Sequence, residues 1–334
     1  PATGTITSLR DKRLGLEVFA GPAAVPVVID DASDTWGHNV FLFDRAIGTF
    51  TAQSVRLVAH GPVKSVVRIV SAYGKSRLVQ DFSLVRDLDE IFVQATLDWR
   101  ERHKMLKLRF PLHLQFMRAT YEIPYGHIER FANGEEEPGQ SWVDLSGTSR
   151  DTDGLYGLSI LNDGKYSFDV SIRDIGMTIV RSPIYAHHMP AVADHEAQYT
   201  YMDQGVQHFR YALLPHEGGW SEASTVQRAA ELNAAPMPLF ATFHDGPLPL
   251  HGSFLSVDRD NILASVLKKA EEGDDLVVRL VETSNNQTRA TLCMPFVRRT
   301  IELDFRPCEI KTLRIPLDSD RPIVETNLME WPES

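Results

Sequence analysis

Cysteine is scarce in this 334-residue sequence, which holds Cys293 and Cys308 and no others. Two cysteines cannot by themselves build a disulfide framework or a four-ligand zinc site. Both lie in or beside segments with the pattern of β-strands, so we expect them to be free, buried thiols.

Long apolar runs and an excess of positive charge are also missing. No uninterrupted apolar stretch approaches the roughly 20 residues that span a bilayer, and no basic start with an apolar segment indicates a signal peptide. The formal net charge is −11, whereas nucleic acids and anionic membranes are bound by clustered Lys and Arg. We therefore expect neither nucleic acid nor a membrane as a partner.

Motifs with preset chemistry are absent as well, since neither a nucleophile elbow nor a phosphate loop is found. His187 and His188, with Asp194 and His195 nearby, match no spacing in which the fold presets metal ligands. Adjacent histidines in a strand point to opposite faces, so we expect a structural or solvent-facing role and no metal ligand in this chain.

Short strand patterns fill most of the sequence. At 334 residues the chain exceeds the usual size of one hydrophobic core, so two domains are expected. Residues 6–9 and 14–19 are expected to form a hairpin around a polar turn, whereas residues 21–35, rich in Pro, Ala and Asp, are expected to form a loop.

Two segments alternate apolar and polar residues with a period of two. Every second residue is apolar in residues 91–99 and again in residues 106–112. Such alternation places one strand face on a core and the other in water, which is typical of antiparallel sheets. Lys107 and Arg109 occupy the polar face. The recurring strands, with no long helix between them, predict a large β-sandwich.

One helix is predicted near residue 225. Ser224 or Thr225 can cap a run at helical spacing over residues 226–232, and Asn233 with Pro236 ends it. Prolines then crowd the next residues and predict an extended connector with a domain boundary. We predict a large all-β domain over residues 1–243 and a small β-sandwich over residues 244–334.

Tryptophan and acidic residues offer few further signals. Trp36, Trp99 and Trp142 could form a sugar-stacking surface with His38, but tryptophan more often lies in a core, and Trp36 sits in a polar segment. Residues 135–137 are three consecutive glutamates that we expect to form a solvated loop. Catalytic carboxylates of glycosidases must flank a substrate at a defined separation, which a run in sequence does not supply.

A resemblance extends these inferences. The chain resembles the C-terminal half of family 38 glycoside hydrolases, the α-mannosidases, in their bacterial and cytosolic branch. The likeness is carried by an ordered set of segments that runs nearly end to end: residues 4–9, 98–99, 106–111, 121–130, 142–146, 156–157, 161–166, 181–183, 203–205, 211–216, 254–257, 267–271 and 309–312.

The resemblance implies a galactose-mutarotase-like β-supersandwich followed by a small β-sandwich. It also implies a partner, the protein's own N-terminal α/β catalytic domain, which would hold zinc through His and Asp ligands and supply an Asp nucleophile for retaining hydrolysis. No His-x-Asp on a parallel strand corresponds to that domain here, and the sequence begins at Pro1 rather than Met. We therefore expect an excised, cytoplasmic C-terminal portion with no catalytic residue and no cofactor of its own, and with mannose-containing oligosaccharide as the substrate of the whole enzyme.

Several residues are candidates for the surface that faces the substrate or the catalytic domain. They are Trp36, His38, His127, Glu129, Arg130 and Arg181, and the two arginines have pairing with acidic neighbours as a competing role. An excised piece would expose apolar surface, which favours association into a homo-oligomer.

Two other functions stay open. A free-standing, mutarotase-like aldose epimerase would need a His acid and a Glu base across a groove, for which His127 with Glu129, or His187 with Glu196, are candidates. A carbohydrate-binding module would bind mannosides without chemistry.

Overall fold

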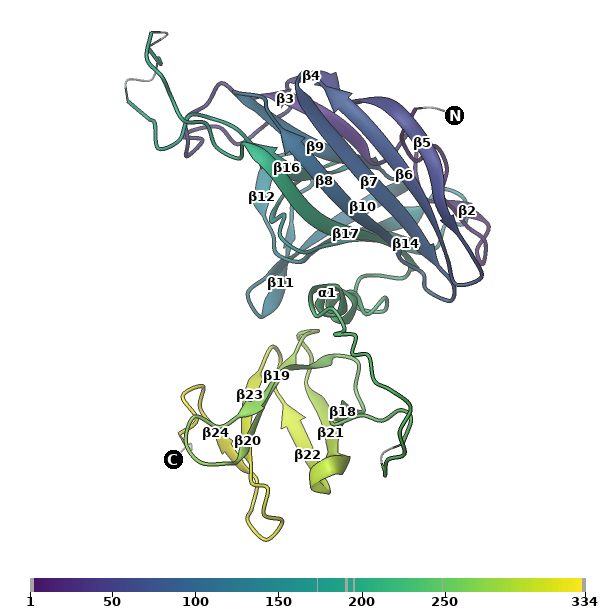
Figure 1. Cartoon of the computed structure of the whole chain (residues 1–334), viewed down its shortest axis with the longest axis vertical. Coiled ribbons are helices and arrows are strands. Elements are labelled where there is room, and N and C mark those ends of the chain that lie inside the picture. Colours follow the sequence, from purple (N-terminus) through teal and green to yellow (C-terminus); the bar gives the residue numbers. More distant parts are fainter. Residues whose placement is uncertain (1–2, 173, 190–191, 195, 248, 332–334) are drawn as a thin grey trace. The chain divides into compact units, whose positions relative to one another are not determined.

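The computed structural model describes residues 3–172, 174–189, 192–194, 196–247 and 249–331. It contains two compact units (Figure 1). The large unit comprises residues 1–123 and 127–233, and the small unit comprises residues 124–126 and 234–334. The boundary predicted between residues 243 and 244 stays a prediction, because it falls inside the segment that joins the last helix of the large unit to the first strand of the small one.

Two large antiparallel sheets form the large unit (Figure 1). The nine-stranded sheet has the order β11 (Gly126–Arg130), β10 (Leu114–Ile123), β13 (Trp142–Ser149), β14 (Leu155–Asn162), β17 (Gly205–Glu217), β8 (Ile91–Trp99), β7 (Ser76–Val85), β6 (Lys64–Tyr73) and β5 (Thr51–His60). The six-stranded sheet has the order β12 (Glu136–Pro138), β15 (Ser167–Ser171), β16 (Asp174–Arg181), β9 (Lys104–Pro111), β3 (Val25–Asp30) and β4 (Ala46–Thr49). A short hairpin of β1 (Arg10–Asp11) and β2 (Leu16–Glu17) precedes both sheets in the sequence.

The core between the sheets is built by the alternating residues. Leu97 of β8 and Leu106, Leu108 and Phe110 of β9 are fully buried in one cluster with residues of both sheets. Period-two alternation produces this arrangement because successive side chains of a strand point to opposite faces. The predicted all-β supersandwich is thereby confirmed.

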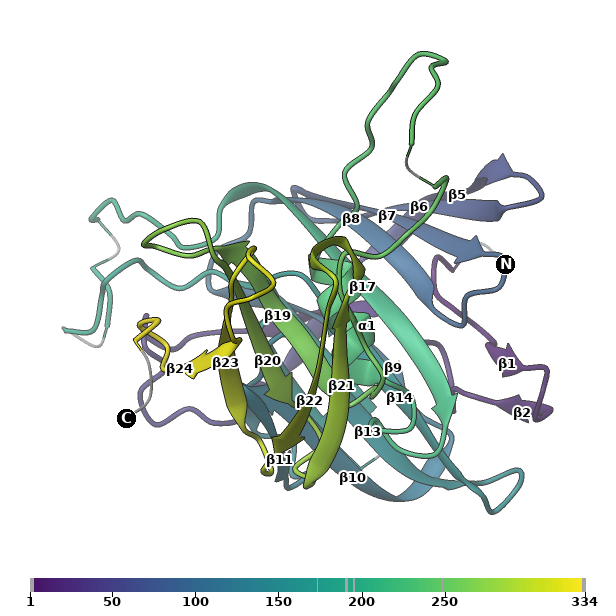
Figure 2. The ribbon, with the colours of Figure 1, turned by 90° about the horizontal axis from the view of Figure 1, so that it is seen from below.

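Helix α1 (Thr225–Asn233) lies on the outer face of the nine-stranded sheet, in contact with β14 (Figure 2). Its buried Ala229 packs with Trp142, Leu161 and Ala212 of the sheet. This helix was predicted at the same position, and Asn233 ends it by donating from its side-chain amide to the Ala229 carbonyl at 2.9 Å. It is too short to span a bilayer, and none of the other described helices is long and apolar enough to do so.

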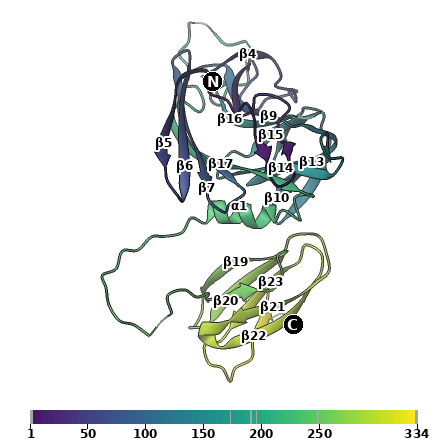
Figure 3. The same ribbon diagram turned by 90° about the vertical axis from the view of Figure 1, so that its right-hand side faces the viewer.

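The small unit is a β-sandwich with its own core (Figure 3). A three-stranded sheet is ordered β18 (Ser256–Val257), β21 (Thr288–Met294) and β22 (Arg299–Phe305). A four-stranded sheet is ordered β19 (Ile262–Lys269), β20 (Leu276–Glu282), β23 (Ile310–Ile315) and β24 (Val324–Thr326), and a 3₁₀ turn, η1 (Pro295–Val297), precedes β22. The predicted small sandwich is confirmed.

The prediction of a loop over residues 21–35 was wrong for residues 25–30, which form strand β3. Strand β3 pairs with β9 on one side and with β4 on the other, although Pro26 lies within it. Pro26 has no N–H, but its carbonyl still accepts a hydrogen bond from the Phe50 amide at 3.0 Å. Long-range pairing on both sides therefore overrides the loop-like composition.

The prediction that the polar face of β9 lies in water was wrong at Lys107. Lys107 is 0% exposed, and its Nζ lies 2.5 Å from the Glu136 carboxylate and 2.6 Å from that of Asp169. Arg109 pairs with Asp169 at 2.5 Å and with Asp174 at 3.2 Å. Strands β12, β15 and β16 supply these carboxylates, so the glutamate run is partly a paired strand rather than the solvated loop that we expected.

The structure also decides two smaller predictions, on the cysteines and on the tryptophans. Both cysteines are free, but Cys293 is half-buried and Cys308 is exposed, so the expectation of burial was wrong. Trp99 and Trp142 are fully buried core residues, whereas Trp36 is 61% exposed. Only Trp36 of these three is thus available to a ligand.

Candidate functional site

Two histidines and an aspartate meet on loops that leave the six-stranded sheet. We call Asp34, His38 and His188 the His–Asp cluster. Asp34 and His38 follow β3, and His188 follows β16. Because β3 and β16 both run antiparallel to the intervening β9, they are parallel to each other and end at the same sheet edge. The topology therefore brings together residues that lie about 150 positions apart, as the contact between His188 and Asp34 shows.

One carboxylate oxygen serves both imidazoles. Asp34 Oδ2 lies 2.6 Å from His38 Nδ1 and 2.5 Å from His188 Nδ1. The two ring centroids are 4.3 Å apart, and the three potential ligand atoms all lie within 4.8 Å of one another. The set of two imidazole nitrogens and one carboxylate oxygen could hold a metal ion. Residue spacing in the sequence predicts no metal ligand here.

The second oxygen of Asp34 fixes the carboxylate in place. Asp34 Oδ1 accepts hydrogen bonds from the backbone amides of Trp36 at 2.9 Å and His38 at 3.2 Å. Desolvation acts to raise the pKa of Asp34, but the hydrogen bonds from His38 and His188 outweigh it and hold that pKa well below its usual range. Asp34 is consequently ionised at neutral pH.

Arg181, at the end of β16, holds the Asp34 loop. Its guanidinium donates to the Asp31 carboxylate at 2.8 Å, to the Ser33 hydroxyl at 2.5 Å, and to the carbonyls of Asp34 and Thr35 at 2.6 and 2.9 Å. Each of the three guanidinium nitrogens therefore donates at least one hydrogen bond within the protein, and the group is only partly exposed. Arg181 is thus a positioning residue of the loop, in line with its predicted competing role.

The predicted surface residues fall into two groups. Trp36 and His38 lie on the Asp34 loop, which Arg181 of β16 contacts, and the Trp36 ring lies 5.9 Å from His38 and 6.3 Å from His188. The other three lie on β11, the edge strand of the nine-stranded sheet. Figure 1 shows β11 well separated from the loops after β16, so the candidates do not form one site.

The residues on β11 have structural contacts. Arg130 pairs with Glu137 at 2.9 Å and lies over the Tyr121 ring, 5.0 Å from its centroid. Exposed Glu129 faces Arg118 at 3.5 Å, and His127 packs on Trp220 with ring centroids 4.4 Å apart. Such contacts hold a strand edge in place. The predicted acid/base pair of His127 and Glu129 stays a prediction.

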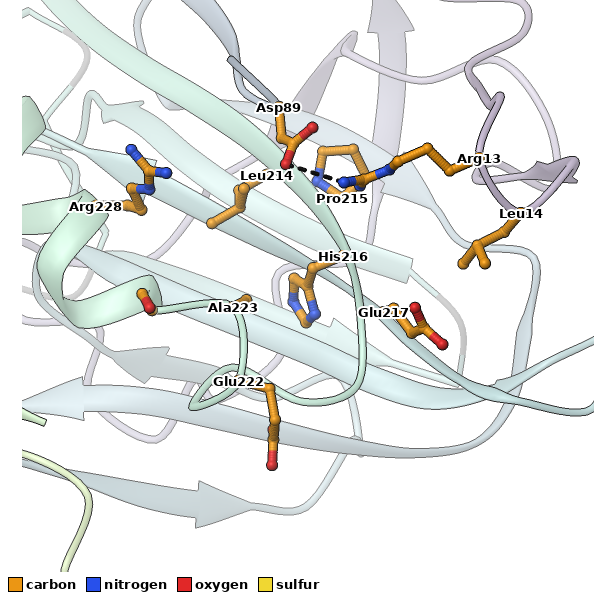
Figure 4. A pocket seen from close by; sticks show the side chains of 11 residues that line it. Arg13, Leu14, Asp89, Leu214, Pro215, His216, Glu217, Glu222, Ala223 and Arg228 are labelled. Atoms are coloured by element: carbon orange, nitrogen blue, oxygen red, sulfur yellow. Dashed lines mark hydrogen bonds and ion pairs between the residues drawn. The ribbon is translucent and has the colours of Figure 1, made fainter. Parts of the chain in front are cut away.

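A pocket of about 370 Å³ opens beside α1, between β17 and the β1–β2 hairpin (Figure 4). Charged residues of both signs line it, with the pair Arg13 and Asp89 at 3.3 Å on one side and Glu222 on the other. His216 lies in its wall. The volume is at the lower end of the range for small-molecule sites, about 300–1,000 Å³.

Behind that wall His216 belongs to a buried polar network. His216 Nε2 lies 2.8 Å from Asp144 Oδ2 and 3.2 Å from Ser159 Oγ, and Ser159 Oγ is also 2.7 Å from the Thr225 hydroxyl of α1. A catalytic triad needs the serine and the carboxylate on opposite nitrogens of the imidazole. Here the serine and the carboxylate both contact Nε2, so Ser159 is not arranged as a triad nucleophile. The network instead joins α1 to the sheet.

Sequence reasoning missed two features of these sites. His38 was a candidate and Asp34 lies four residues before it, but the contact of both with His188 depends on the parallel course of β3 and β16. His216 was named only within residues 211–216, one of the segments that carry the family resemblance. No local spacing signals the contact with His188 or the network of His216, because the contacting residues come from segments far apart in the sequence.

Comparison with known proteins agrees with this architecture. The model of the glycosyl hydrolases family 38 C-terminal domain matches residues 1–191. That of the family 38 C-terminal beta sandwich domain matches residues 261–333. A structure described as a protein in glycosyl hydrolase family 38 from Enterococcus faecalis superposes with a TM-score of 0.75 at 18% identity, over 92% of this chain and 42% of that one.

Relatives in sequence carry the name α-mannosidase. Alpha-mannosidase G of Dictyostelium discoideum is 26% identical in an alignment 326 residues long, which covers 88% of this chain and 28% of the relative. Human alpha-mannosidase 2C1 is 31% identical in an alignment 219 residues long, which covers 62% of this chain and 19% of the relative. The chain thus spans less than a third of the length of these relatives. The first family match alone covers more than half of the chain, and the chain therefore belongs to glycosyl hydrolase family 38, as the C-terminal region of that family.

Proposed function

We propose that this chain is the non-catalytic β portion of a zinc-dependent, retaining α-mannosidase that hydrolyses mannose-containing oligosaccharides in the cytoplasm. Its role is to pack against an N-terminal catalytic domain, which is its main partner, and to complete one side of the mannoside pocket. The observation that carries the proposal is the pair of family 38 C-terminal matches, in chain order, together with relatives named α-mannosidase.

The residues of the chain support a role outside the chemical step. In the proposed enzyme an aspartate near zinc attacks the sugar, and such an aspartate needs a free oxygen. Among the described residues, Asp34 is the carboxylate that lies with two potential zinc ligands, and both its oxygens already accept two hydrogen bonds each. The nucleophile and the catalytic zinc ion are accordingly assigned to the partner domain.

Trp36 is the residue best placed to meet a sugar or the catalytic domain. Its ring is 61% exposed and stands beside His38 and His188. An exposed indole can stack on the apolar face of a sugar or fill a groove of a partner protein. Arg181 holds the loop that presents it.

The proposal is tested first in the gene. The reading frame upstream of Pro1 is expected to encode several hundred residues that include a His-x-Asp and a further Asp. In that whole protein, Trp36→Ala is expected to raise KM for an aryl α-mannoside. Trp331→Ala is the matched control, because Trp331 is similarly exposed, at 67%, but lies in the small unit.

A second assay uses the 334-residue chain alone. It is expected to release no aryl group from an α-mannoside. Chelator-sensitive hydrolysis by this chain would refute its non-catalytic role. Accelerated anomer interconversion, followed by polarimetry and lost in His127→Ala, would instead support the epimerase alternative.

A further inference from the structure

We propose that the His–Asp cluster of Asp34, His38 and His188 is a binding site for one divalent transition-metal ion of the zinc class. The site lies wholly within the large unit, and the inference does not depend on the proposed mannosidase role. It rests on the donor set, on the geometry of the three side chains and on the groups that hold them.

The donor set fits such an ion. Two imidazole nitrogens and one carboxylate oxygen are the protein ligands of many zinc sites, and the same set binds Co²⁺, Ni²⁺ and Fe²⁺. Calcium and magnesium prefer oxygen ligands, so they are disfavoured. Three protein ligands leave at least one coordination position for water. The imidazoles are about half exposed, at 50% and 48%, so that position can be reached from solvent.

The geometry requires only a small adjustment. Ligands about 2.0–2.2 Å from a tetrahedral zinc ion are roughly 3.3–3.6 Å apart. The contacts of Asp34 with the two imidazoles are 2.6 and 2.5 Å, and all three ligand atoms fall within 4.8 Å. The ion would enter between atoms that now share protons. Each Nδ1–H that donates to Asp34 would be replaced by a bond to the metal, and its proton would leave to Nε2 or to solvent.

A supporting shell already orients the ligands. Asp34 Oδ1 is fixed by two backbone amides, which leaves Oδ2 toward the imidazoles. Thr35 joins the two loops, since its amide donates to the His187 carbonyl at 3.3 Å and its hydroxyl accepts from the His187 amide at 3.0 Å. Arg181 anchors the Asp34 and Thr35 carbonyls. Metal sites depend on such outer groups, whose removal typically weakens binding by about 10- to 100-fold.

Metal binding is to be measured on the untagged 334-residue chain after chelator treatment and dialysis. Calorimetric titration with Zn²⁺ is expected to show one ion per chain. Cobalt is expected to give visible absorption bands of a four- or five-coordinate ion. Because Trp36 lies beside both imidazoles, bound Co²⁺ is also expected to quench its fluorescence, and Trp36→Phe removes that part of the signal.

Three variants test the ligands themselves. Asp34→Asn, His38→Ala and His188→Ala are each expected to weaken zinc binding at least about tenfold. His60→Ala is the matched control, because His60 is also exposed and also bonded through Nδ1, to the Ser65 hydroxyl at 2.9 Å. Its zinc affinity is expected to equal that of the unchanged chain. Circular dichroism and thermal unfolding check that each variant is folded.

Thr35→Val tests the supporting shell. It keeps all three ligands but removes the hydroxyl that joins the loops, and about 10-fold weaker binding is expected. The proposal is overturned if the chain binds no zinc in stoichiometric amount, which would make the cluster a hydrogen-bonded His–Asp group only. It is equally overturned if zinc binding is unchanged in Asp34→Asn combined with His188→Ala.

Discussion

Replacing Lys107 by Met should strongly destabilise the large unit. The Lys107 ammonium is 0% exposed and lies 2.5 Å from Glu136 and 2.6 Å from Asp169. With Arg109 and Asp174 these residues form a network of two cations and three carboxylates. Burial raises the pKa of Asp174 even though Arg109 beside it opposes the rise. Methionine fills a similar volume but leaves three carboxylates with one cation.

The size of the effect follows from that imbalance. Removing one partner of a buried ion pair typically costs about 3–5 kcal/mol, because the remaining charge is desolvated without compensation. We expect this loss in the free energy of unfolding. A typical domain has about 5–15 kcal/mol in total, so the variant should unfold at a much lower urea concentration.

Urea unfolding followed by tryptophan fluorescence measures this change. Trp99 and Trp142 are fully buried in the large unit, so their emission reports its unfolding. Arg118→Met is the control, since Arg118 and Glu129 form an exposed pair at 3.5 Å, worth at most about 1 kcal/mol.

A double variant separates charge from packing. Adding Glu136→Gln to Lys107→Met removes one of the uncompensated carboxylates. The combined loss should therefore be at least about 1 kcal/mol smaller than the sum of the single losses. A loss below about 1 kcal/mol for Lys107→Met alone, or strict additivity in the double variant, would show that the buried charges do not depend on one another.

Three further predictions concern the same core. Burial raises the pKa of Tyr211 far above its ordinary value, despite a hydrogen bond from Gln80 that acts to lower it. As the pH rises, the unfolded chain thus loses this proton before the folded chain does. Above about pH 10 the free energy of unfolding should therefore fall by about 1.4 kcal/mol per pH unit more in the unchanged chain than in Tyr211→Phe. Urea unfolding of both chains between about pH 9 and 11 measures this, and equal pH dependence of the two would contradict it. The Tyr121 hydroxyl is buried without a hydrogen-bond partner among the described residues, so Tyr121→Phe should leave stability unchanged or raise it by up to about 1 kcal/mol, and a measured loss would be evidence against that picture. Gly176→Ala would place a Cβ against Asp169 and the Arg109 guanidinium, so a loss of about 1–3 kcal/mol is expected in urea unfolding, and wild-type stability would show that the network can move aside.

Local pattern was enough to predict several elements of the fold. Strands β8 and β9 follow from alternation at period two, and α1 follows from helical spacing that ends at Asn233 before Pro236. The family 38 resemblance was also available from ordered segments and is confirmed by the matches over residues 1–191 and 261–333. These features depend on neighbours in the sequence, or on a likeness that the sequence itself carries.

The candidate site was only partly predictable. Trp36 was recognised as hard to bury, because it lies in a polar segment, and it is 61% exposed. Arg181 was named with pairing as its competing role, and that pairing is what the structure shows. His188 was set aside because its neighbours in sequence form no metal motif, whereas its partners in space come from the loop after β3.

The sequence by itself determined where strands such as β8 and β9 and the helix form, and which face of those strands is apolar, because these properties repeat at the period of the local backbone. Tertiary structure alone decided what covers the opposite face. Strands β12, β15 and β16 bring carboxylates over β9 and turn Lys107 from a solvent-facing residue into a buried one. The parallel course of β3 and β16 likewise joins Asp34 to His188. Such contacts depend on strand order, which no local spacing encodes.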